Sequence, residues 1–301
     1  MKGIKVVAVA NRTINKAVRV LEQSGYNSDY SLCRDSDELN KAIKKGKIGV
    51  VENPLLLTLT SVDIVCDCTG DPETGAALGL SAIERGIHFI ACPEADTAVG
   101  PFLNALANSK GVVYTGAEGD EPAVIMNLYR YVTLIGLDII AAGKFKKYHN
   151  PFATPASVKP WSDKYDHNPF KIASFADGSK MSIEMALVAN ATGLVPEIRG
   201  MHCPSASLDT VARILSLKKQ GGILDSTGVV EVVRGVEPSG GVFIIASTSH
   251  PQIISDLQYL KMGYGPNYLF YRPYHLCAVE MGISIVRAVL DRDSTIAPAG
   301  P

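Results

Sequence analysis

Four side chains that can hold or transfer a proton lie in polar segments between apolar runs of this sequence: Asp120, Lys146, Lys180 and His275. Lys146 belongs to the segment GKFKKYHNP, which could bind a carboxylate or phosphate or supply the acid for carbonyl reduction, although a run of lysines is usually solvated. Lys180 has apolar neighbours, and burial lowers the pKa of a lysine towards a value useful for proton transfer. These residues therefore indicate acid–base chemistry at a carbonyl or hydroxyl group.

Asp120 lies in the acidic turn EGDEP, and His275 lies in the aromatic segment GYGPNYLFYRPYHLC. A carboxylate in such a turn could orient a substrate hydroxyl, shuttle a proton or hold a divalent cation. It could also cap the helix that follows, because carboxylates stabilise helix N-termini. His275 could donate to a substrate oxygen, whereas a single histidine among aromatic residues is often only packed and hydrogen-bonded. The sequence leaves both alternatives open.

A second acidic pair, Glu94 and Asp96, follows another predicted strand. Divalent cations such as Mg²⁺ prefer carboxylate oxygens, so this pair is our candidate for a metal site. The same side chains could instead stabilise the start of a helix, and the two roles are compatible.

Two polar turns point to a nucleotide cofactor. Asn11, Arg12 and Thr13 follow the apolar run KVVAVA, and Thr69 with Gly70 follows the run VDIVCDC. In a Rossmann fold, ligands collect at the carboxyl ends of parallel strands, where an acidic residue bonds the ribose 2′-hydroxyl of NAD and an arginine accommodates the 2′-phosphate of NADP. Arg12 without an acidic neighbour therefore favours NADP over NAD, and the Thr-Gly turn would let the backbone approach the nicotinamide or its ribose. A helix-capping turn and a plain strand-to-helix connection are the alternatives.

Composition excludes several classes of partner. The chain has 301 residues, a net charge of −1 and 47% hydrophobic residues, so no basic excess indicates nucleic acid. No apolar run reaches the roughly 20 residues that span a bilayer, and the N-terminus lacks a secretory h-region. Six cysteines in a chain this long do not form a disulfide framework. We expect a cytoplasmic homo-oligomer that binds a small-molecule substrate, without nucleic acid or membrane.

Up to residue 142, short apolar runs alternate with amphipathic stretches, as in a parallel sheet with crossover helices. The predicted strands are 5–13, 48–52, 62–68, 88–91, 111–115 and 137–142. The predicted helices are 13–24, 36–45, 73–85, 99–108 and 122–135. We therefore expect a cofactor-binding domain over residues 1–142.

The pattern changes after residue 142. Segments 170–175 and 180–183 look like a hairpin around Asp177-Gly178, with a helix from 184 to 191. Segments 229–234 and 241–246 look like a second strand pair around the turn EPSGG. We expect a catalytic domain over residues 143–275, and a C-terminal helix within residues 276–301 that packs back on the first domain.

Several long strings carry a family resemblance: VVAVANRT, EADTAVGP, VVYTGAEGDEPAVIMNLYR, SFADGSKMSIEMALVANATG, KMGYGPNYLFYRPYHLC and IAPAG. In these the chain resembles bacterial oxidoreductases that comprise predicted homoserine dehydrogenases and deoxyxylulose-phosphate-reductoisomerase-like (DRL) enzymes, which often carry a C-terminal SAF domain. The resemblance extends over almost the whole chain.

The resemblance implies an α/β fold with a Rossmann domain and an α+β catalytic domain of homoserine-dehydrogenase type. It implies NAD(P)-dependent oxidation or reduction of a small polyol-derived or sugar-phosphate substrate, or reductoisomerase activity with NADPH and a divalent metal. Under it Asn11, Arg12, Thr13, Thr69 and Gly70 become cofactor contacts. The candidates for substrate binding or catalysis become Asp120, Lys146 and Lys180, with Glu94 and Asp96 behind them.

The first strand and the Gly-rich turn of a complete Rossmann domain do not occur before residue 5. The turn would supply the backbone N–H groups that hold the cofactor pyrophosphate. The sequence therefore predicts an incomplete parallel sheet, shortened at both chain ends relative to the family, with weak NADP(H) binding and slow or no turnover. A shortened homologue without catalytic activity is the alternative.

Overall fold

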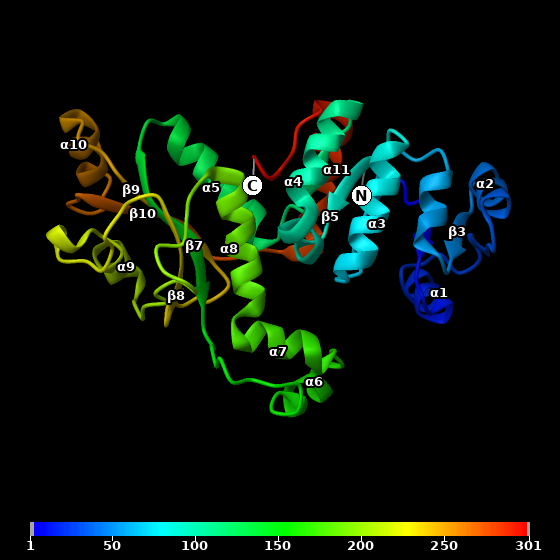
Figure 1. Cartoon of the computed structure of the whole chain (residues 1–301), viewed down its shortest axis with the longest axis horizontal. Helices are drawn as coiled ribbons and strands as arrows, with labels where there is room; N and C mark the ends of the chain where they lie inside the picture. Colours follow the sequence, from blue (N-terminus) through cyan, green and yellow to red (C-terminus); the bar gives the residue numbers. More distant parts are fainter. Residues whose placement is uncertain (1–2, 300–301) are drawn as a thin grey trace. The chain divides into compact units, whose positions relative to one another are not determined.

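The computed structural model describes residues 3–299, apart from the side chains of Glu94 and Ala95. The chain forms two compact units (Figure 1). Unit 1 comprises the described residues up to Ala117 together with Met281–Ser294, and unit 2 comprises Glu118–Glu280 with the described residues from Thr295 on. The boundary thus lies before residue 118 and not after residue 142, because the helix and strand in between belong to the core of unit 2.

Unit 1 begins with a three-stranded parallel sheet of order β1-β3-β2. Its strands are β1 (Ala8–Ala10), β2 (Tyr30–Leu32) and β3 (Ile48–Val51). Helix α1 (Ile14–Gln23) buries Ala17 and Leu21 against β3, and α2 (Ser36–Lys44) buries Leu39 and Ala42 in a second cluster beside it. The strand predicted over 5–13 is the shorter β1, and β3 pairs with β1 on one side. Among the described residues no strand pairs with its other side.

A second parallel sheet of unit 1 has the order β4-β5-β6. Its elements are η1 (Pro54–Leu59), β4 (Ile64–Cys66), α3 (Pro72–Glu84), β5 (His88–Ala91), α4 (Pro93–Lys110) and β6 (Tyr114–Gly116). The terminal segments α11 (Met281–Val286) and η4 (Arg287–Asp291) also belong to unit 1. Ser284 donates to the Gly116 carbonyl, and Arg292 hydrogen-bonds His88, so the C-terminal helix packs on this sheet.

Unit 2 is built on a mixed four-stranded sheet of order β10-β9-β7-β8. Its strands are β7 (Asp138–Lys146), β8 (Val229–Arg234), β9 (Val242–Ser247) and β10 (Asn267–Arg272). Two predictions are corrected here. Segment 137–142 is part of the central strand of this sheet and not the last strand of the first domain. The strands near 229–234 and 241–246 do not pair with each other, because β7 lies between them.

Buried, mostly apolar side chains occupy successive positions along β8 and β9. Because successive side chains of a strand point to opposite faces, both faces of the sheet are buried. Helices α5 (Glu121–Leu134) and α8 (Ser179–Thr192) cover one face, where they pack on Val242 and Ile244. Helix α9 (Leu208–Ile214) packs on the other face, against Phe243 and Ile245. The remaining elements of unit 2 are α6 (Lys159–Tyr165), α7 (Pro169–Asp177), η2 (Lys218–Gln220), α10 (Pro251–Tyr259) and η3 (Cys277–Glu280).

The predicted hairpin around Asp177-Gly178 is wrong. The structure has two helices there, α7 and α8, joined at Gly178, whose φ of +98° lies in the left-handed region. Asp177 accepts hydrogen bonds from the backbone and hydroxyl of Ser179. An Asp-Gly pair, which is typical of tight hairpin turns, here ends one helix and starts the next. Both uses are possible because glycine adopts a positive φ at low cost. The α/β class predicted for the whole chain is confirmed.

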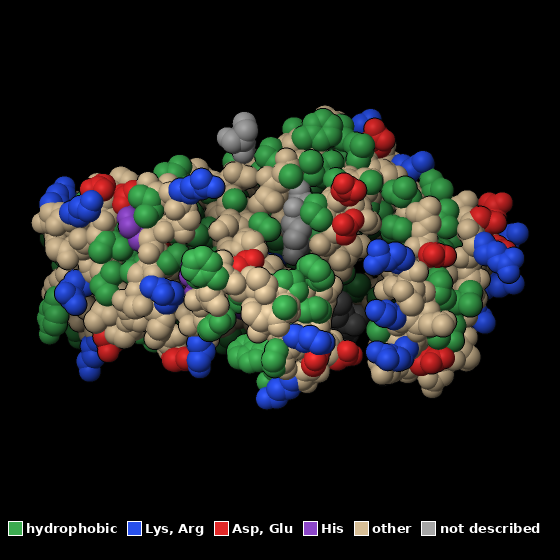
Figure 2. All heavy atoms as spheres, turned by 60° about the horizontal axis from the view of Figure 1, so that its bottom comes forward, with side chains coloured by type: hydrophobic (Ala, Val, Ile, Leu, Met, Phe, Trp, Pro, Cys, Tyr) green, Lys and Arg blue, Asp and Glu red, His purple; other side chains and the backbone are tan. Residues whose placement is uncertain are grey.

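Charged side chains of both signs are interspersed over the face shown in Figure 2, in keeping with the net charge of −1. Within residues 3–299, no helix combines the length and apolar character needed to cross a bilayer.

Gly143 in the middle of β7 is the tightest point of this sheet. A Cβ atom there would lie 1.7 Å from the carbonyl oxygen of Glu231 and 3.0 Å from the ring of Phe243. We expect Gly143→Ala to lower the free energy of unfolding by about 3 kcal/mol, because overpacking in a central strand has no room to relax.

Chemical denaturation of the wild type and the variant measures this effect. Gly240→Ala is the matched control, since its Cβ would lie 3.9 Å from the His275 ring, an ordinary contact. Equal stability of the two variants would contradict the assignment of Gly143 to a packed strand.

Candidate functional site

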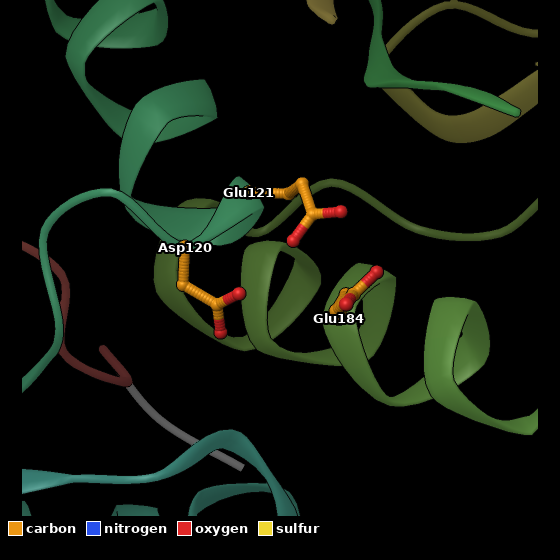
Figure 3. A group of neighbouring side chains, drawn as sticks. All are labelled: Asp120, Glu121 and Glu184. Atoms are coloured by element: carbon orange, nitrogen blue, oxygen red, sulfur yellow. The ribbon is translucent and has the colours of Figure 1, made fainter. Parts of the chain in front are cut away.

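The polar side chains predicted to do chemistry gather in unit 2. We call them the acid–base group: Asp120, Glu121, Lys144, Lys146, Lys180, Glu184 and His275. The first two residues lie at the start of α5, the next two on β7, the next two on α8 and the last after β10. Figure 3 shows the three carboxylates directed towards one another, two from the start of α5 and one from α8.

At the centre of this group, the ammonium of Lys144 lies between two carboxylates. It donates to Oε1 of Glu121 and to Oε2 of Glu184, and the three side chains are 5%, 10% and 1% exposed. Although burial opposes charge, the two glutamates raise the pKa of Lys144, and Lys144 with His275 lowers the pKa of Glu121. Burial and the neighbouring Glu121 raise the pKa of Glu184. Lys144 is therefore a fixed cation and a poor proton donor.

Lys180 lies beside Glu184, the carboxylate that it shares with Lys144, and beside Asp120. Its Nζ lies 3.4 Å from Oε1 of Glu184 and 4.0 Å from Oδ2 of Asp120. Residues 180 and 184 share a helix face because they are one turn apart on α8. The side chain of Lys180 is 18% exposed, so it combines fixed partners with access from solvent.

Asp120 carries an exchangeable proton near neutral pH. Burial raises the pKa of Asp120 to about 8, helped by the neighbouring charges of Glu121 and Glu184 and opposed by Lys180. Its carboxyl also hydrogen-bonds to Glu121. Asp120 occupies the N-cap position of α5 but makes no capping hydrogen bond, so its side chain is available to the group and does not serve the helix.

Lys146, two residues beyond Lys144 on the same strand, has the opposite electrostatic character. Burial and the charge of Lys144 lower the pKa of Lys146. The thiol of Cys277 also lies within the electrostatic field of the acid–base group. Burial, and then the charges of Glu121 and Asp120, raise the pKa of this thiol. The site thus holds one lysine stabilised as a cation and another that loses its proton more readily.

His275 is oriented by the backbone. Its Nδ1 lies 2.7 Å from the carbonyl oxygen of Gly240, and because a carbonyl only accepts, Nδ1 donates. This leaves Nε2 to face Oε1 of Glu121 at 3.5 Å. His275 is therefore both packed and directed at the acid–base group.

The structure brings together all four residues that the sequence nominated for catalysis: Asp120, Lys146, Lys180 and His275. Sequence reasoning did not select Glu121, Lys144 and Glu184, which form the buried centre. The spacing of four between Lys180 and Glu184 was visible in the sequence, but it did not nominate Glu184, because segment 180–183 was predicted to be a strand.

The predicted cofactor turns lie in unit 1, at the ends of β1 and β4. Asn11 accepts from the backbone N–H of Thr13 at 2.8 Å, and Thr69 donates to Asp67 at 2.8 Å, so both turns are ordered by their own side chains. Arg12 is exposed. It contributes, after the hydrogen bonds from Thr74, to lowering the pKa of Asp71, which lies just beyond Gly70. The two turns are therefore neighbours within unit 1.

The acidic pair proposed for a metal has a different setting. Both residues lie in the first turns of α4, and the side chain of Glu94 is outside the described residues. Asp96 is 3% exposed and accepts a hydrogen bond from the Tyr114 hydroxyl. Among the described residues, the acidic group with ligand atoms within 4.8 Å of one another is instead Asp120, Glu121 and Glu184.

A cavity of about 950 Å³ lies elsewhere in unit 1, against α2, β2, β3 and η1. Its lining mixes apolar side chains with the charged residues Arg34, Glu38, Lys41, Lys45 and Glu52. None of the acid–base group borders it, so this cavity and the acid–base group lie in different units.

Comparison with protein families gives one match: residues 119–281, just over half of the chain, fit the family described as oxidoreductase DRL, catalytic domain. This segment contains every member of the acid–base group. A comparison with curated protein sequences gives no match.

Among solved structures, a probable dehydrogenase from Thermotoga maritima is 10% identical, with 97% of this chain and 82% of that chain covered and a TM-score of 0.45. A 1-deoxy-D-xylulose 5-phosphate reductoisomerase from Zymomonas mobilis in complex with NADPH is 12% identical over 61% of this chain and 50% of that chain, with a TM-score of 0.38. An oxidoreductase domain protein from Kribbella flavida is 16% identical over 49% of this chain and 44% of that chain, with a TM-score of 0.30. The chain spans about half the length of the last two proteins.

The buried carboxyl of Asp96 predicts a pH-dependent stability. Burial raises the pKa of Asp96 from 3.8 to about 6, so the folded state holds this proton over a range in which the unfolded chain releases it. The free energy of unfolding should therefore fall by roughly 3 kcal/mol as the pH rises from about 4 to about 6.

Urea denaturation at several pH values tests this dependence. Asp96→Asn should remove the decrease, because an amide oxygen still accepts from Tyr114 but does not titrate. Asp166→Asn, at an exposed position where asparagine tolerates the left-handed backbone, is the control. An unchanged pH slope in Asp96→Asn would refute the assignment.

Proposed function

Since the chain belongs to the family of the oxidoreductase DRL catalytic domain, we propose that it is an NADP-dependent oxidoreductase. Its substrate is a small hydroxy or carbonyl compound, polyol-derived or a sugar phosphate. The observation that carries the proposal is the convergence of Lys180, Lys146 and Asp120 on one site within the matched segment. NAD is the weaker cofactor.

The division of labour follows the two units. Arg12 would hold the 2′-phosphate of NADP, and the Thr69-Gly70 turn would approach the nicotinamide end. When bound, NADPH would supply a hydride, a proton with two electrons, for the carbonyl carbon. The exposed position of Arg12 and the proximity of the two turns support this assignment.

In unit 2, the ammonium of Lys180 hydrogen-bonds the substrate carbonyl oxygen and stabilises the negative charge that develops there. As the C=O bond becomes single, its electron pair moves to oxygen, which takes a proton from Lys180. Asp120, with its pKa near 8, then returns a proton to the lysine at neutral pH. Lys146 and His275 are the remaining groups able to bind a phosphate or carboxylate of the substrate.

The reductoisomerase alternative uses the same substrate class with NADPH and a divalent metal. With Asp120 protonated near neutral pH, three lysines stand beside two carboxylates, and this positive excess favours an anionic substrate such as a sugar phosphate, which suits both activities. The two activities differ in the need for a divalent metal, which only the reductoisomerase alternative requires. Lys144 already contacts two of the carboxylates that would bind such a metal. A chain without catalytic activity is the second alternative.

Replacing Lys180 by methionine tests the chemistry. We expect turnover to fall by roughly two decades or more, as is usual on loss of a general acid, with folding retained. The loss of NADPH absorbance with small keto-sugar phosphates and hydroxy-ketones measures the rate.

Lys147→Met is the matched control, since that lysine is 74% exposed and pairs with Glu237 at the surface. Lys146→Met should behave like Lys180→Met if Lys146 also contacts the substrate. A Lys180→Met variant that keeps its rate but unfolds more readily would show that this lysine is structural.

Replacing Arg12 by alanine tests the cofactor. We expect wild-type protein to bind NADPH more tightly than NADH, and Arg12→Ala to weaken NADPH by about tenfold, close to 1.4 kcal/mol, with NADH unchanged. Calorimetric titration with both cofactors gives the affinities.

Arg19→Ala on the exposed face of α1 is the control for loss of a positive charge. Equal binding of NADH and NADPH by the wild type would overturn the preference for NADP.

A further inference from the structure

We infer that the ammonium of Lys144 is the built-in cation of this site and takes the position that a divalent metal would otherwise occupy. The inference about metal binding stands on the contacts and charges of these residues, whereas its extension to metal-independent turnover rests on the proposed function. The acid–base group contains the carboxylates that a metal enzyme would need, yet its charges are already satisfied from within.

The carboxylates by themselves suit a metal. Oxygens of Asp120, Glu121 and Glu184 come within 4.8 Å of one another, and Figure 3 shows them facing a common centre. Mg²⁺ and Mn²⁺ prefer such oxygen ligands. On this basis alone, a divalent ion would be the expected occupant.

Cations of the chain already meet each of these carboxylates. Lys144 contacts Oε1 of Glu121 and Oε2 of Glu184. Lys180 lies 3.4 Å from the other oxygen of Glu184 and 4.0 Å from Asp120. A metal bridging Glu121 and Glu184 would have to displace Lys144.

Displacement of Lys144 would be unfavourable for two reasons. The side chain is only 5% exposed and extends from β7, which lies inside the sheet between β8 and β9, so a metal would have to displace a buried, strand-anchored lysine. An ammonium removed from both carboxylates inside the protein would lose the interactions that offset its desolvation.

The charge balance of the group points the same way. Its three carboxyl groups are matched by three lysines, at positions 144, 146 and 180, even when every carboxyl is ionised. A divalent ion would therefore enter a site without net negative charge. The residues do not fit a metal ion unless Lys144 is removed.

The experiment is a titration with Mn²⁺ of the full chain, followed by the electron paramagnetic resonance signal of the free ion. We expect wild-type protein to leave the signal unchanged up to millimolar concentrations. Lys144→Met removes the internal cation and should bind Mn²⁺ at least about tenfold more tightly than the wild type. Lys147→Met, a surface lysine on the same segment, should match the wild type.

Stoichiometric micromolar binding of Mn²⁺ by the wild type, lost in Glu184→Gln, would overturn the inference. If Lys144→Met does not fold, the wild-type titration decides, because tight binding there refutes the inference and its absence supports it. The result is independent of activity. Wild-type protein that binds no Mn²⁺ and also oxidises no NADPH would leave the internal cation standing and refute the proposed function alone.

Discussion

The structure of unit 2 depends on one arrangement, the burial of Lys144 between Glu121 and Glu184. Removing three charges from water costs several kcal/mol for each ion, and only close, well-oriented contacts recover it. Such contacts require the start of α5, the middle of α8 and strand β7 to be held in fixed positions relative to one another. The apolar core beneath these elements, in which α5 and α8 pack on Val242 and Ile244, supplies that rigidity.

The position of β7 inside the sheet helps to meet this constraint. Antiparallel pairing with β9 on one side and parallel pairing with β8 on the other leave its backbone fully bonded along residues 141–144. Gly143, just before Lys144, lets β8 and β9 approach closely. A strand held on both sides places the lysine that follows with little freedom, which is what a buried ion pair needs.

Local pattern was enough to predict much of the fold. The strand 88–91 is β5 as predicted, and the proline that opens α5 was recognised because its ring suits a first turn. What failed depended on long-range pairing or on ambiguous turn signals. The insertion of β7 between β8 and β9 joins residues about ninety positions apart, which no local period reports. The Asp177-Gly178 pair serves a hairpin and a helix junction equally well, so tertiary packing of Ala173, Ala176 and Met181 decided in favour of helices.

The acid–base group likewise contains residues that the sequence predicted and residues that it did not. Asp120, Lys146, Lys180 and His275 were accessible to sequence reasoning, because each stands in a polar turn or breaks an apolar run. Lys144, Glu121 and Glu184 stand in the same segments but were not nominated as site residues, since their significance lies in contacts between three separate elements. Those contacts also distinguish lysines that look alike in the sequence. Two carboxylates raise the pKa of Lys144 and fix its charge, whereas burial beside Lys144 lowers the pKa of Lys146. One residue's permanent charge thus tunes its neighbour two positions along the strand, and a single β-strand delivers both a structural cation and a group able to exchange its proton.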